Sequence, residues 1–429
     1  MQNMETLRTG STGPTVELLQ SVLRRLGFFT GSIDGVFGGQ THNAAAAYQR
    51  SRGLIADGIV GNSTWINLMP FINGYDIHTV APGDTVFSIA RNYSAGEAGI
   101  MMANPGINVY NLQIGQKLVV PFGTIVPGDI SYSYDILVMN VNALKTVYPF
   151  IRTDYIGSSA MCKPIPYIRI GTGPREVFYN ASFHANEWIN TPVIMRFAEN
   201  LLRAYVSNTN IQGYNARNIL RDISIYIVPM VNPDGVDLVT GAIKKDSDAY
   251  VSAEQIARDY PFIPFPQGWK ANIRGIDLNL QFPANWERAR EIKFSQGFVS
   301  PAPRDYVGPA PLTASESCAV YKFTLAHDFR LTLSYHTQGS VIFWQYLDYN
   351  PANAYFIGTQ FSRVSGYSLE QTPYESSFAG YKDWYIQAYN RPGYTVESGY
   401  GTNPLPISQF DKIYGDNEGI FVLGAVLAP

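Results

Sequence analysis

The first part of the chain alternates between apolar helical patterns and glycine-rich turns. One amphipathic helix is predicted from the helical spacing of its apolar residues, and a second helix is predicted over residues 41–52. The apolar positions of the first helix are Val16, Leu18, Leu19, Val22, Leu23 and Leu26. An Asp-Gly-x-apolar-Gly turn follows each helix, at residues 34–38 and 57–61, where glycine permits a positive φ and aspartate caps the turn. This short internal repeat predicts a small three-helix unit over residues 1–70.

A different pattern runs over residues 75–121. A strand-like segment around His78 leads into Pro-Gly-Asp-Thr, where Asp84 or Thr85 can cap a helix. The apolar face of that helix consists of Val86, Ile89 and Ala90. A second helical stretch and a closing apolar run, 114–121, complete the unit. The expected order is strand, helix, helix, strand, with His78 as a structural residue of the entry strand.

Beyond a Pro- and Gly-rich linker, residues 122–129, the pattern changes again. Buried-type strands and helical stretches now alternate along the chain. The clearest strands are 223–229 and 331–335, and the clearest helices are 191–207 and 315–329. This alternation predicts a single α/β domain with a mixed sheet over residues 130–429.

Composition mainly excludes classes of function. With 31 Lys+Arg and 34 Asp+Glu, the formal charge is −3, which gives no electrostatic footprint for nucleic acid or an anionic membrane. Cys162 and Cys318 form no CxxC pair, so a cysteine-based zinc site and a disulfide framework are excluded, while one disulfide or two free thiols stay open. The N-terminus has no apolar signal region, and no run approaches the roughly 20 apolar residues of a membrane helix.

The closely spaced pair of potential metal ligands is His184 and Glu187, in Phe-His-Ala-Asn-Glu-Trp. Because they are three residues apart, both side chains lie on one face of a helical turn and can reach one ion. The pair follows a strand-like run, 177–182, and a strand end that opens into a helix is a common place for a site in α/β folds. The motif alone is a weak indication of a metal site.

A third ligand must come from elsewhere in the chain. Of the five histidines, His42 and His78 lie in the N-terminal units. His327 lies at a predicted helix end, where the helix dipole favours a cation. His336 ends the apolar strand 331–335, and packing does not explain a polar residue at that strand tip. Two histidines, one glutamate and a water would form a catalytic zinc site with an open position.

Such a site also needs a carboxylate that takes a proton from the water and hands it to the leaving amine. The zinc ion itself lowers the pKa of the water and polarises the scissile carbonyl. Glu397, at the end of the strand-like Gly-Tyr-Thr-Val-Glu, is the candidate for this base.

Taken together, these residues resemble the zinc carboxypeptidase family over residues 130–429. The matching elements, in family order, are His184-x-x-Glu187, Val228-Pro-x-Val-Asn-Pro-Asp-Gly235, Gly275-Ile-Asp-Leu-Asn279, His336 and Glu397. The resemblance implies that His184, Glu187 and His336 bind one Zn²⁺ ion per chain. It also implies that Glu397 is the general base and acid.

The resemblance implies two further catalytic roles. The family places a cation on the carbonyl oxygen, where it stabilises the developing oxyanion. In Trp-Lys-Ala-Asn-Ile-Arg this cation is Lys270, at a position where relatives usually have Arg, or Arg274. A mobile tyrosine normally precedes the catalytic glutamate, and Tyr374 is the nearest match, with Tyr381 as the alternative.

Two departures from the family pattern concern the substrate. Carboxypeptidases hold a terminal carboxylate with an Asn-Arg pair, but here Asn279 is followed by Leu280, which cannot bind a carboxylate. Lys382 occupies a position that helps to set the charge of the leaving-side pocket, and it suits a substrate side chain with a carboxylate. With Asn279 and Lys382 as substrate-binding residues, the domain resembles the branch of γ-D-glutamyl-L-diamino acid endopeptidases. These cut between γ-D-Glu and meso-diaminopimelate or Lys in the stem peptide of the bacterial wall.

The two N-terminal units carry resemblances of their own. Residues 1–70 are similar to the three-helix peptidoglycan-binding domain, and residues 75–121 resemble a LysM domain, which binds N-acetylglucosamine-containing glycan. We therefore expect a hydrolase held on peptidoglycan by these modules, associated with the cell wall or with spores and sporulation. Because no signal peptide is recognisable, we expect that the enzyme is released by lysis, acts within the forespore, or has lost its leader. The alternatives are a stem-peptide carboxypeptidase that uses Arg288 or Arg290 for the terminal carboxylate, and a non-catalytic wall-binding protein.

Overall fold

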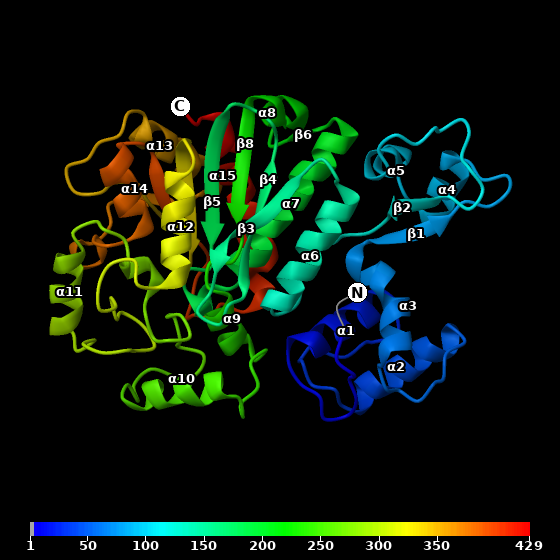
Figure 1. The fold of residues 1–429 in the computed structure, drawn as a ribbon, viewed down its shortest axis with the longest axis horizontal. Coiled ribbons are helices and arrows are strands. Elements are labelled where there is room, and N and C mark those ends of the chain that lie inside the picture. The colour runs from blue at the N-terminus through cyan, green and yellow to red at the C-terminus, as the bar shows by residue number, and fades with distance from the viewer. Residues whose placement is uncertain (1–3) are drawn as a thin grey trace. The chain divides into compact units, whose positions relative to one another are not determined.

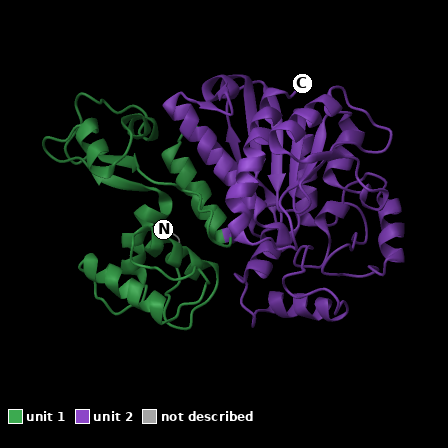
Figure 2. Ribbon diagram, turned by 180° about the vertical axis from the view of Figure 1, so that it is seen from behind, with its two compact units in different colours: residues 1–131, 135–150 green, residues 132–134, 151–429 purple. Residues whose placement is uncertain are grey.

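The computed structural model describes residues 4–429, which divide into two compact units (Figures 1 and 2). Unit 1 contains the described residues up to 131 and residues 135–150, and unit 2 contains residues 132–134 and 151–429. Within residues 4–150 the elements are α1 (Pro14–Arg25), α2 (Gly39–Ser51), α3 (Asn62–Asn73), β1 (Tyr75–Thr79), α4 (Val86–Tyr93), α5 (Glu97–Ala103), β2 (Lys117–Pro121) and α6 (Tyr134–Val147).

Two buried glutamines explain the repeated turns of the three-helix region. The Gln20 side chain accepts a hydrogen bond from Gly35 N (3.0 Å) and donates to the carbonyl of Val36 (3.1 Å). Gln49 accepts from Gly58 N (2.9 Å) and likewise donates to a turn carbonyl. Gly35 and Gly58 have φ values of 67° and 69°, a region that suits glycine. Each turn is therefore fastened to the preceding helix by one amide side chain.

Replacement of Gln49 with alanine tests this arrangement. Because the substitution leaves buried donors and acceptors of the second turn without partners, we expect it to lower the free energy of unfolding of this region by about 2–3 kcal/mol. Hydrogen exchange of peptides from residues 4–73 across a urea series measures the change. Gln40 is exposed, so Gln40→Ala should shift the same value by less than about 0.5 kcal/mol, and an equal loss in both variants would contradict the explanation.

Residues 75–121 form the predicted strand, helix, helix, strand arrangement. Strands β1 and β2 pair antiparallel, with His78 opposite Leu118. Thr85 caps α4, because its hydroxyl accepts a hydrogen bond from Ser88 N at 3.0 Å. Asp84 instead accepts from Ala81 N and lies 2.9 Å from Nε2 of His78. His78 thus has the structural role expected from the sequence.

Unit 2 is built around one large mixed sheet. Its strands are β3 (Arg152–Ser158), β4 (Pro164–Ile170), β5 (Arg175–Ala181), β8 (Ile223–Val228), β9 (Phe329–His336), β10 (Val341–Phe343), β11 (Ser368–Glu370) and β12 (Gly393–Glu397), with a separate small pair, β6 (Asn210–Ile211) and β7 (Tyr214–Asn215). The spatial order is β11-β10-β12-β9-β5-β8-β4-β3. The four central strands, β12, β9, β5 and β8, run parallel, and the outer pairs β10–β12, β8–β4 and β4–β3 are antiparallel.

Helices cover both faces of this sheet (Figure 1). The helices of unit 2 are α7 (Asn190–Ser207), α8 (Ala216–Asp222), α9 (Pro233–Thr240), α10 (Asp248–Arg258), α11 (Trp286–Ser295), α12 (Ser315–Leu325), α13 (Ala354–Ser365), α14 (Tyr381–Tyr389) and α15 (Phe410–Val426). On β5, Phe178 packs against Phe323 and Phe329, whereas the next residue, Tyr179, packs against Phe197 and Phe421 on the opposite face. Both sides of the central strands are therefore buried, as a near-continuous apolar strand sequence indicates.

The helix expected over residues 315–329 is shorter than predicted. Helix α12 ends at Leu325, and β9 begins at Phe329. Glu176 of β5 holds the intervening turn in place. Its carboxylate accepts a hydrogen bond from Asp328 N and lies 3.1 Å from Nδ1 of His327. A tertiary contact therefore sets this boundary, which the local apolar pattern did not reveal.

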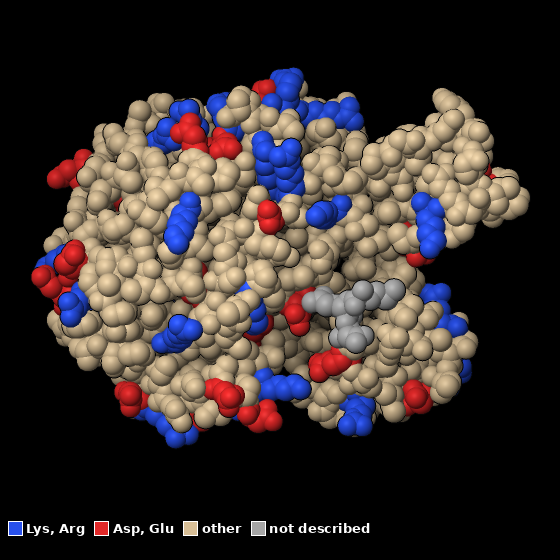
Figure 3. Space-filling model, viewed as in Figure 1, with Lys and Arg blue, Asp and Glu red and all other residues tan. Residues whose placement is uncertain are grey.

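The charged side chains and the cysteines bear on the expectations from composition. Lysine, arginine, aspartate and glutamate are mixed over the face drawn in Figure 3. Cys162 and Cys318 are both free, so the structure has two free thiols and not a disulfide between them. Within residues 4–429, no helix combines the length and the apolar character needed to cross a membrane.

Candidate metal centre and active site

The candidate site lies at the carboxyl edge of the parallel strands. His336 is the last residue of β9 and Glu397 the last of β12, and the two are register partners in the sheet. Strand β5, on the other side of β9, ends at Ala181 and leads within three residues to His184. Because carboxyl ends of parallel strands meet at one edge, segments far apart in sequence bring these side chains together.

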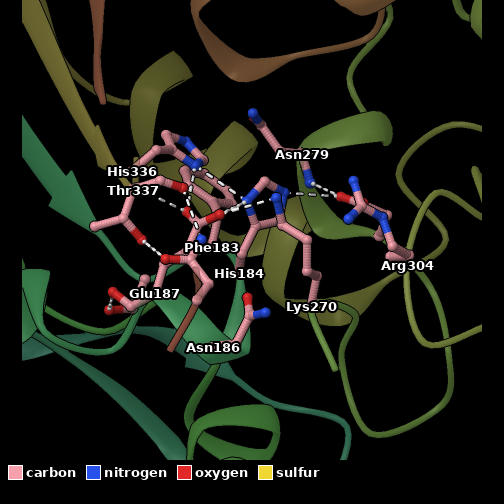
Figure 4. A network of polar contacts seen from close by, with 12 residues as sticks. Phe183, His184, Asn186, Glu187, Lys270, Asn279, Arg304, His336 and Thr337 are labelled. Carbon is pink, nitrogen blue, oxygen red and sulfur yellow. Dashed lines mark hydrogen bonds and ion pairs between the residues drawn. The ribbon is translucent and has the colours of Figure 1, made fainter. Parts of the chain in front are cut away.

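His184, Glu187 and His336 converge on one point (Figure 4). Glu187 ends a single 3₁₀ turn, η1 (Ala185–Glu187), ahead of α7. Its two carboxylate oxygens lie 3.0 Å from Nδ1 of His184 and 2.9 Å from Nδ1 of His336, and the two Nδ1 atoms are 3.1 Å apart. Ligand atoms about 2.0–2.1 Å from a tetrahedral zinc ion are separated by about 3.3 Å, so this donor set fits zinc.

Asp277 orients the first of these histidines. Its Oδ1 lies 3.1 Å from Nε2 of His184, so a proton on Nε2 leaves the lone pair of Nδ1 facing the other two ligands. A carboxylate behind a ligating histidine fixes the tautomer in this way in many metal sites. In the sequence, Asp277 was only part of the Asp-Leu-Asn landmark, and its contact with His184 could not be foreseen.

The electrostatics of the cluster favour a bound cation. Burial disfavours the charged form of His184, but the neighbouring charges of Glu187 and Asp277 outweigh it and raise its pKa to about 9. Burial alone would raise the pKa of Glu187, yet His184 and Lys270 hold it well below its usual value. Burial lowers the pKa of His336. The charges around Glu187 and Asp277 thus keep these two carboxylates ionised, and burial keeps His336 neutral; an ionised carboxylate and a neutral imidazole are the forms that bind metal.

Glu397 lines the same cavity as two of the three ligands, His184 and His336, and is not itself a member of the converging trio. It lines a cavity of 1060 Å³ together with His184 and His336. Burial and the nearby charge of Glu187 raise the pKa of Glu397 to about 8. A carboxylate whose affinity for protons is raised in this way has the property required of a general base near neutral pH.

Of the two candidate cations, the structure brings only Lys270 to the metal ligands. Its Nζ lies 2.9 Å from Oε1 of Glu187, and the side chain lines the cavity. Arg274 is exposed, lies outside the cavity lining, and donates to the carbonyl of Ala160. Arg274 lies in the turn that follows Lys270, where Gly275 N donates to the carbonyl of Asn272 at 2.9 Å.

Neither candidate tyrosine lies against the ligands. Tyr374, in η3 (Tyr374–Ser376), is 58% exposed and packs on Phe378, with the guanidinium of Arg288 over its ring. Its neighbours Pro373 and Ser376 line the cavity, but Tyr374 does not. Tyr381 is buried at the start of α14, and its hydroxyl pairs with Oγ1 of Thr324 at 3.1 Å.

Both residues that the sequence predicts to bind substrate line the cavity, and both already have hydrogen-bond partners within the protein. Oδ1 of Asn279 accepts a hydrogen bond from Tyr381 N (3.0 Å), and Leu280 follows it in the lining. Lys382 is buried, with its ammonium 2.6 Å from Oδ1 of Asp383 and 2.8 Å from the carbonyl of Gln345. The Lys382 charge is therefore already paired within the protein.

The cavity lining contains two further cationic side chains that the sequence did not indicate. Arg288 and Arg290, the alternative partners for a terminal carboxylate, are absent from the cavity lining, whereas Lys293 and Arg304 are part of it. Arg304 belongs to the irregular segment between α11 and α12. No periodicity or motif marks such a residue, so it could be found only from the fold.

Comparison with known proteins agrees with this geometry. The family model described as "Zinc carboxypeptidase" matches residues 138–418, a peptidoglycan binding domain model matches residues 12–68, and a LysM domain model matches residues 78–121. The chain is 44% identical over 303 residues to gamma-D-glutamyl-L-diamino acid endopeptidase 1 of Lysinibacillus sphaericus, which covers 71% of this chain and 74% of that protein. It is 38% identical over 107 residues to the spore cortex-lytic enzyme of Bacillus cereus, with 25% and 40% covered.

Solved structures show the same fold. Thrombin activatable fibrinolysis inhibitor superposes with a TM-score of 0.55 at 17% identity, covering 70% of this chain and 78% of that one. The sheet with its helices on both faces is thus shared with proteins of very different sequence, while the 281 residues of the family match, 138–418, enclose all three converging ligands and Glu397. On this evidence the chain belongs to the zinc carboxypeptidase family of metallopeptidases.

Proposed function

We propose that the protein is a peptidoglycan hydrolase that cleaves the bond between a γ-D-glutamyl residue and a diamino acid, meso-diaminopimelate or Lys, in stem peptides. The observation that carries the proposal is the convergence of His184, Glu187 and His336 beside a cavity that Glu397 also lines. In the same lining, Leu280 stands beside Asn279. The name and 44% identity of the Lysinibacillus relative support the substrate class.

In this proposal His184, Glu187 and His336 hold one zinc ion per chain. When bound, the ion supplies Lewis-acid polarisation of the scissile carbonyl and acidifies a water. Glu397 removes a proton from that water and delivers it to the leaving amine. Lys270 donates to the carbonyl oxygen as negative charge develops there. Asp277 keeps His184 in the tautomer that the site needs.

The remaining candidates act on the substrate in the same proposal. Asn279 and Lys382 contact the diamino acid on the leaving side, with the Lys382 ammonium shared between Asp383 and the substrate. Tyr374 adjoins the cavity through Pro373 and Ser376 and closes on bound substrate. Tyr381 is a packing residue, since its ring and hydroxyl are both engaged inside the core.

The two domains matched in the N-terminal region indicate binding to peptidoglycan. We propose the boundaries 1–70 for the three-helix domain, 75–121 for the LysM domain and 130–429 for the peptidase. Glycan binding by the modules raises the local concentration of stem peptide at the cavity. Location at the cell wall follows from this binding, and the similarity to a spore cortex-lytic enzyme supports a role in spores.

One assay separates the endopeptidase from its carboxypeptidase alternative. Purified stem tripeptide and the same tripeptide amidated at its C-terminus are incubated with the enzyme, and products are identified by mass spectrometry. We expect both to be cleaved at the γ-D-glutamyl bond, because no arginine follows Asn279 to bind a terminal carboxylate. Loss of cleavage on amidation would favour the carboxypeptidase, and absence of cleavage in both would favour a wall-binding protein without activity.

The choice between Lys270 and Arg274 is tested by removing each charge. We expect Lys270→Met to lower kcat/KM about 10²- to 10³-fold, because an oxyanion donor is lost. Arg274→Met should leave kcat/KM unchanged, since Arg274 points away from the cavity. Zinc content, measured by atomic absorption, verifies that the loss of the Lys270–Glu187 contact has not emptied the site. A larger effect from Arg274 would reverse the assignment.

A further inference from the structure

A charged trio occupies part of the cavity wall that the proposed mechanism does not use. Lys293, from α11, places Nζ 2.7 Å from Oδ1 of Asp305, and the other oxygen of Asp305 accepts from Nε of Arg304. All three side chains line the cavity. Two positive charges are thus set against one negative charge, so the trio retains one positive charge that faces the cavity.

The backbone on both sides of Arg304 is hydrogen-bonded to residues of the candidate active site. The carbonyl of Pro303 accepts hydrogen bonds from Lys270 N (2.7 Å) and Ala271 N (2.9 Å). Asp305 N donates to Oδ2 of Asp277 at 3.1 Å, the carboxylate whose other oxygen holds His184. The position of Arg304 relative to Lys270 and the metal ligands is therefore fixed by short hydrogen bonds, although it lies in irregular structure.

The guanidinium keeps its binding edge free. Only Nε is engaged with Asp305, and neither Nη atom of Arg304 has a protein hydrogen-bond partner among residues 4–429. The side chain is 45% exposed within the cavity. Figure 4 shows Arg304 on the side of His184 away from His336 and Glu187. A guanidinium held at Nε with both Nη groups open is preorganised for bidentate contact with a carboxylate.

The substrate class proposed above supplies such a carboxylate. In a γ-glutamyl linkage the scissile carbonyl belongs to the side chain, so the α-carboxylate of the glutamyl residue stays free a few bonds away. An α-linked residue without an acidic side chain has no carboxylate at that place. Lys270 is the candidate for contact with the scissile carbonyl oxygen, and Arg304 stands next to it through Pro303. On the other side of the bond, the ammonium of Lys382 is occupied by Asp383.

We propose that Arg304 binds the α-carboxylate of the γ-glutamyl residue and thereby selects γ-glutamyl substrates over peptides that lack a carboxylate at that place. The inference rests on the proposed function, because it names the group by which the same cavity recognises its substrate. Asp305 and Lys293 are positioning residues in this assignment, since they act through Arg304.

Three stem peptides test the assignment in the full-length zinc enzyme. The first is L-Ala-γ-D-Glu-L-Lys, the second has the glutamyl α-carboxylate as an amide, and the third has the Lys carboxylate as an amide. We expect the wild type to prefer the first over the second by about 10- to 100-fold in kcat/KM, the range of a charge-assisted hydrogen-bond pair. Arg304→Gln should lose most of this preference by slowing cleavage of the free acid, while its rate on the glutamyl amide stays near that of the wild type.

The outcomes distinguish the inference from the proposed function. Arg304→Lys keeps the charge without the fork and should recover only part of the preference. Arg258→Gln, which removes an exposed arginine paired with Glu254 on α10, should behave as the wild type. An equal fall on all three peptides in Arg304→Gln, or a fall that follows the Lys amide instead, would overturn the assignment while leaving the endopeptidase intact. Failure of the wild type to cleave any of them would overturn both.

Discussion

Replacement of Glu397 by glutamine is expected to lower kcat for stem-peptide cleavage by about 10²- to 10⁴-fold while zinc content stays at the wild-type value. Glu397 ends β12 in register with His336 and lines the cavity, yet it stands outside the converging trio. An amide of nearly the same size preserves packing but cannot take a proton from water. Steady-state kinetics and atomic absorption on the same samples measure the two quantities.

The pH profile gives this prediction a second readout. A base works only when it is deprotonated, so activity of the wild type should fall as pH drops below the pKa of Glu397. Burial and the charge of Glu187 raise that pKa to about 8, and a bound dication would shift it downward. In Glu397→Gln this acidic limb should disappear from the residual rate. Glu291→Gln, on the surface beside Arg288, is the matched control, and activity within a few-fold of wild type in Glu397→Gln would refute the assigned role.

Much of the fold could be predicted from local patterns. A run of residues that is buried on both faces, as in β8 and β9, can be recognised from a short stretch of sequence, and so can the helical period of α1. The residues His184, His336 and Glu397 could be singled out for the same reason, since each follows or ends a strand. Parallel pairing then brings such strand ends together without further information.

The rest of the site depends on contacts that local sequence does not encode. Lys270 and Arg274 are four residues apart. Lys270 N donates to the carbonyl of Pro303, whereas Arg274 lies in the following turn and its N–H donates to Oδ1 of Asn272. The ammonium of Lys382 is engaged by its own neighbour, Asp383. Arg304 gains its place through hydrogen bonds to a segment about thirty residues earlier. Irregular chain held by long-range backbone contacts has no periodicity from which to predict it.

Removal of zinc is expected to abolish cleavage, with activity returning when one equivalent of Zn²⁺ per chain is restored. The three ligands are buried, and Asp277 adds a second negative charge to that of the ligand Glu187, so the cation contributes to stability as well as to chemistry. A ligand that binds only the folded state stabilises it by about 2.7 kcal/mol at a hundred times its Kd. Chelation should therefore lower the Tm of unit 2 together with the activity, and calorimetry with metal titration measures both.

His336→Ala provides the sharper form of this test. Loss of one Nδ1 ligand leaves two side chains for the ion, so the variant should hold much less than one zinc per chain and stay inactive when Zn²⁺ is added. His327→Ala is the matched histidine control, because His327 contacts Glu176 and lies outside the cavity lining. It should bind zinc and cleave peptide normally. If His336→Ala instead retained full zinc and recovered activity, the third ligand would have to come from another residue of the cavity. The pairing of His336 with Glu397 across β9 and β12 would then not be required for catalysis.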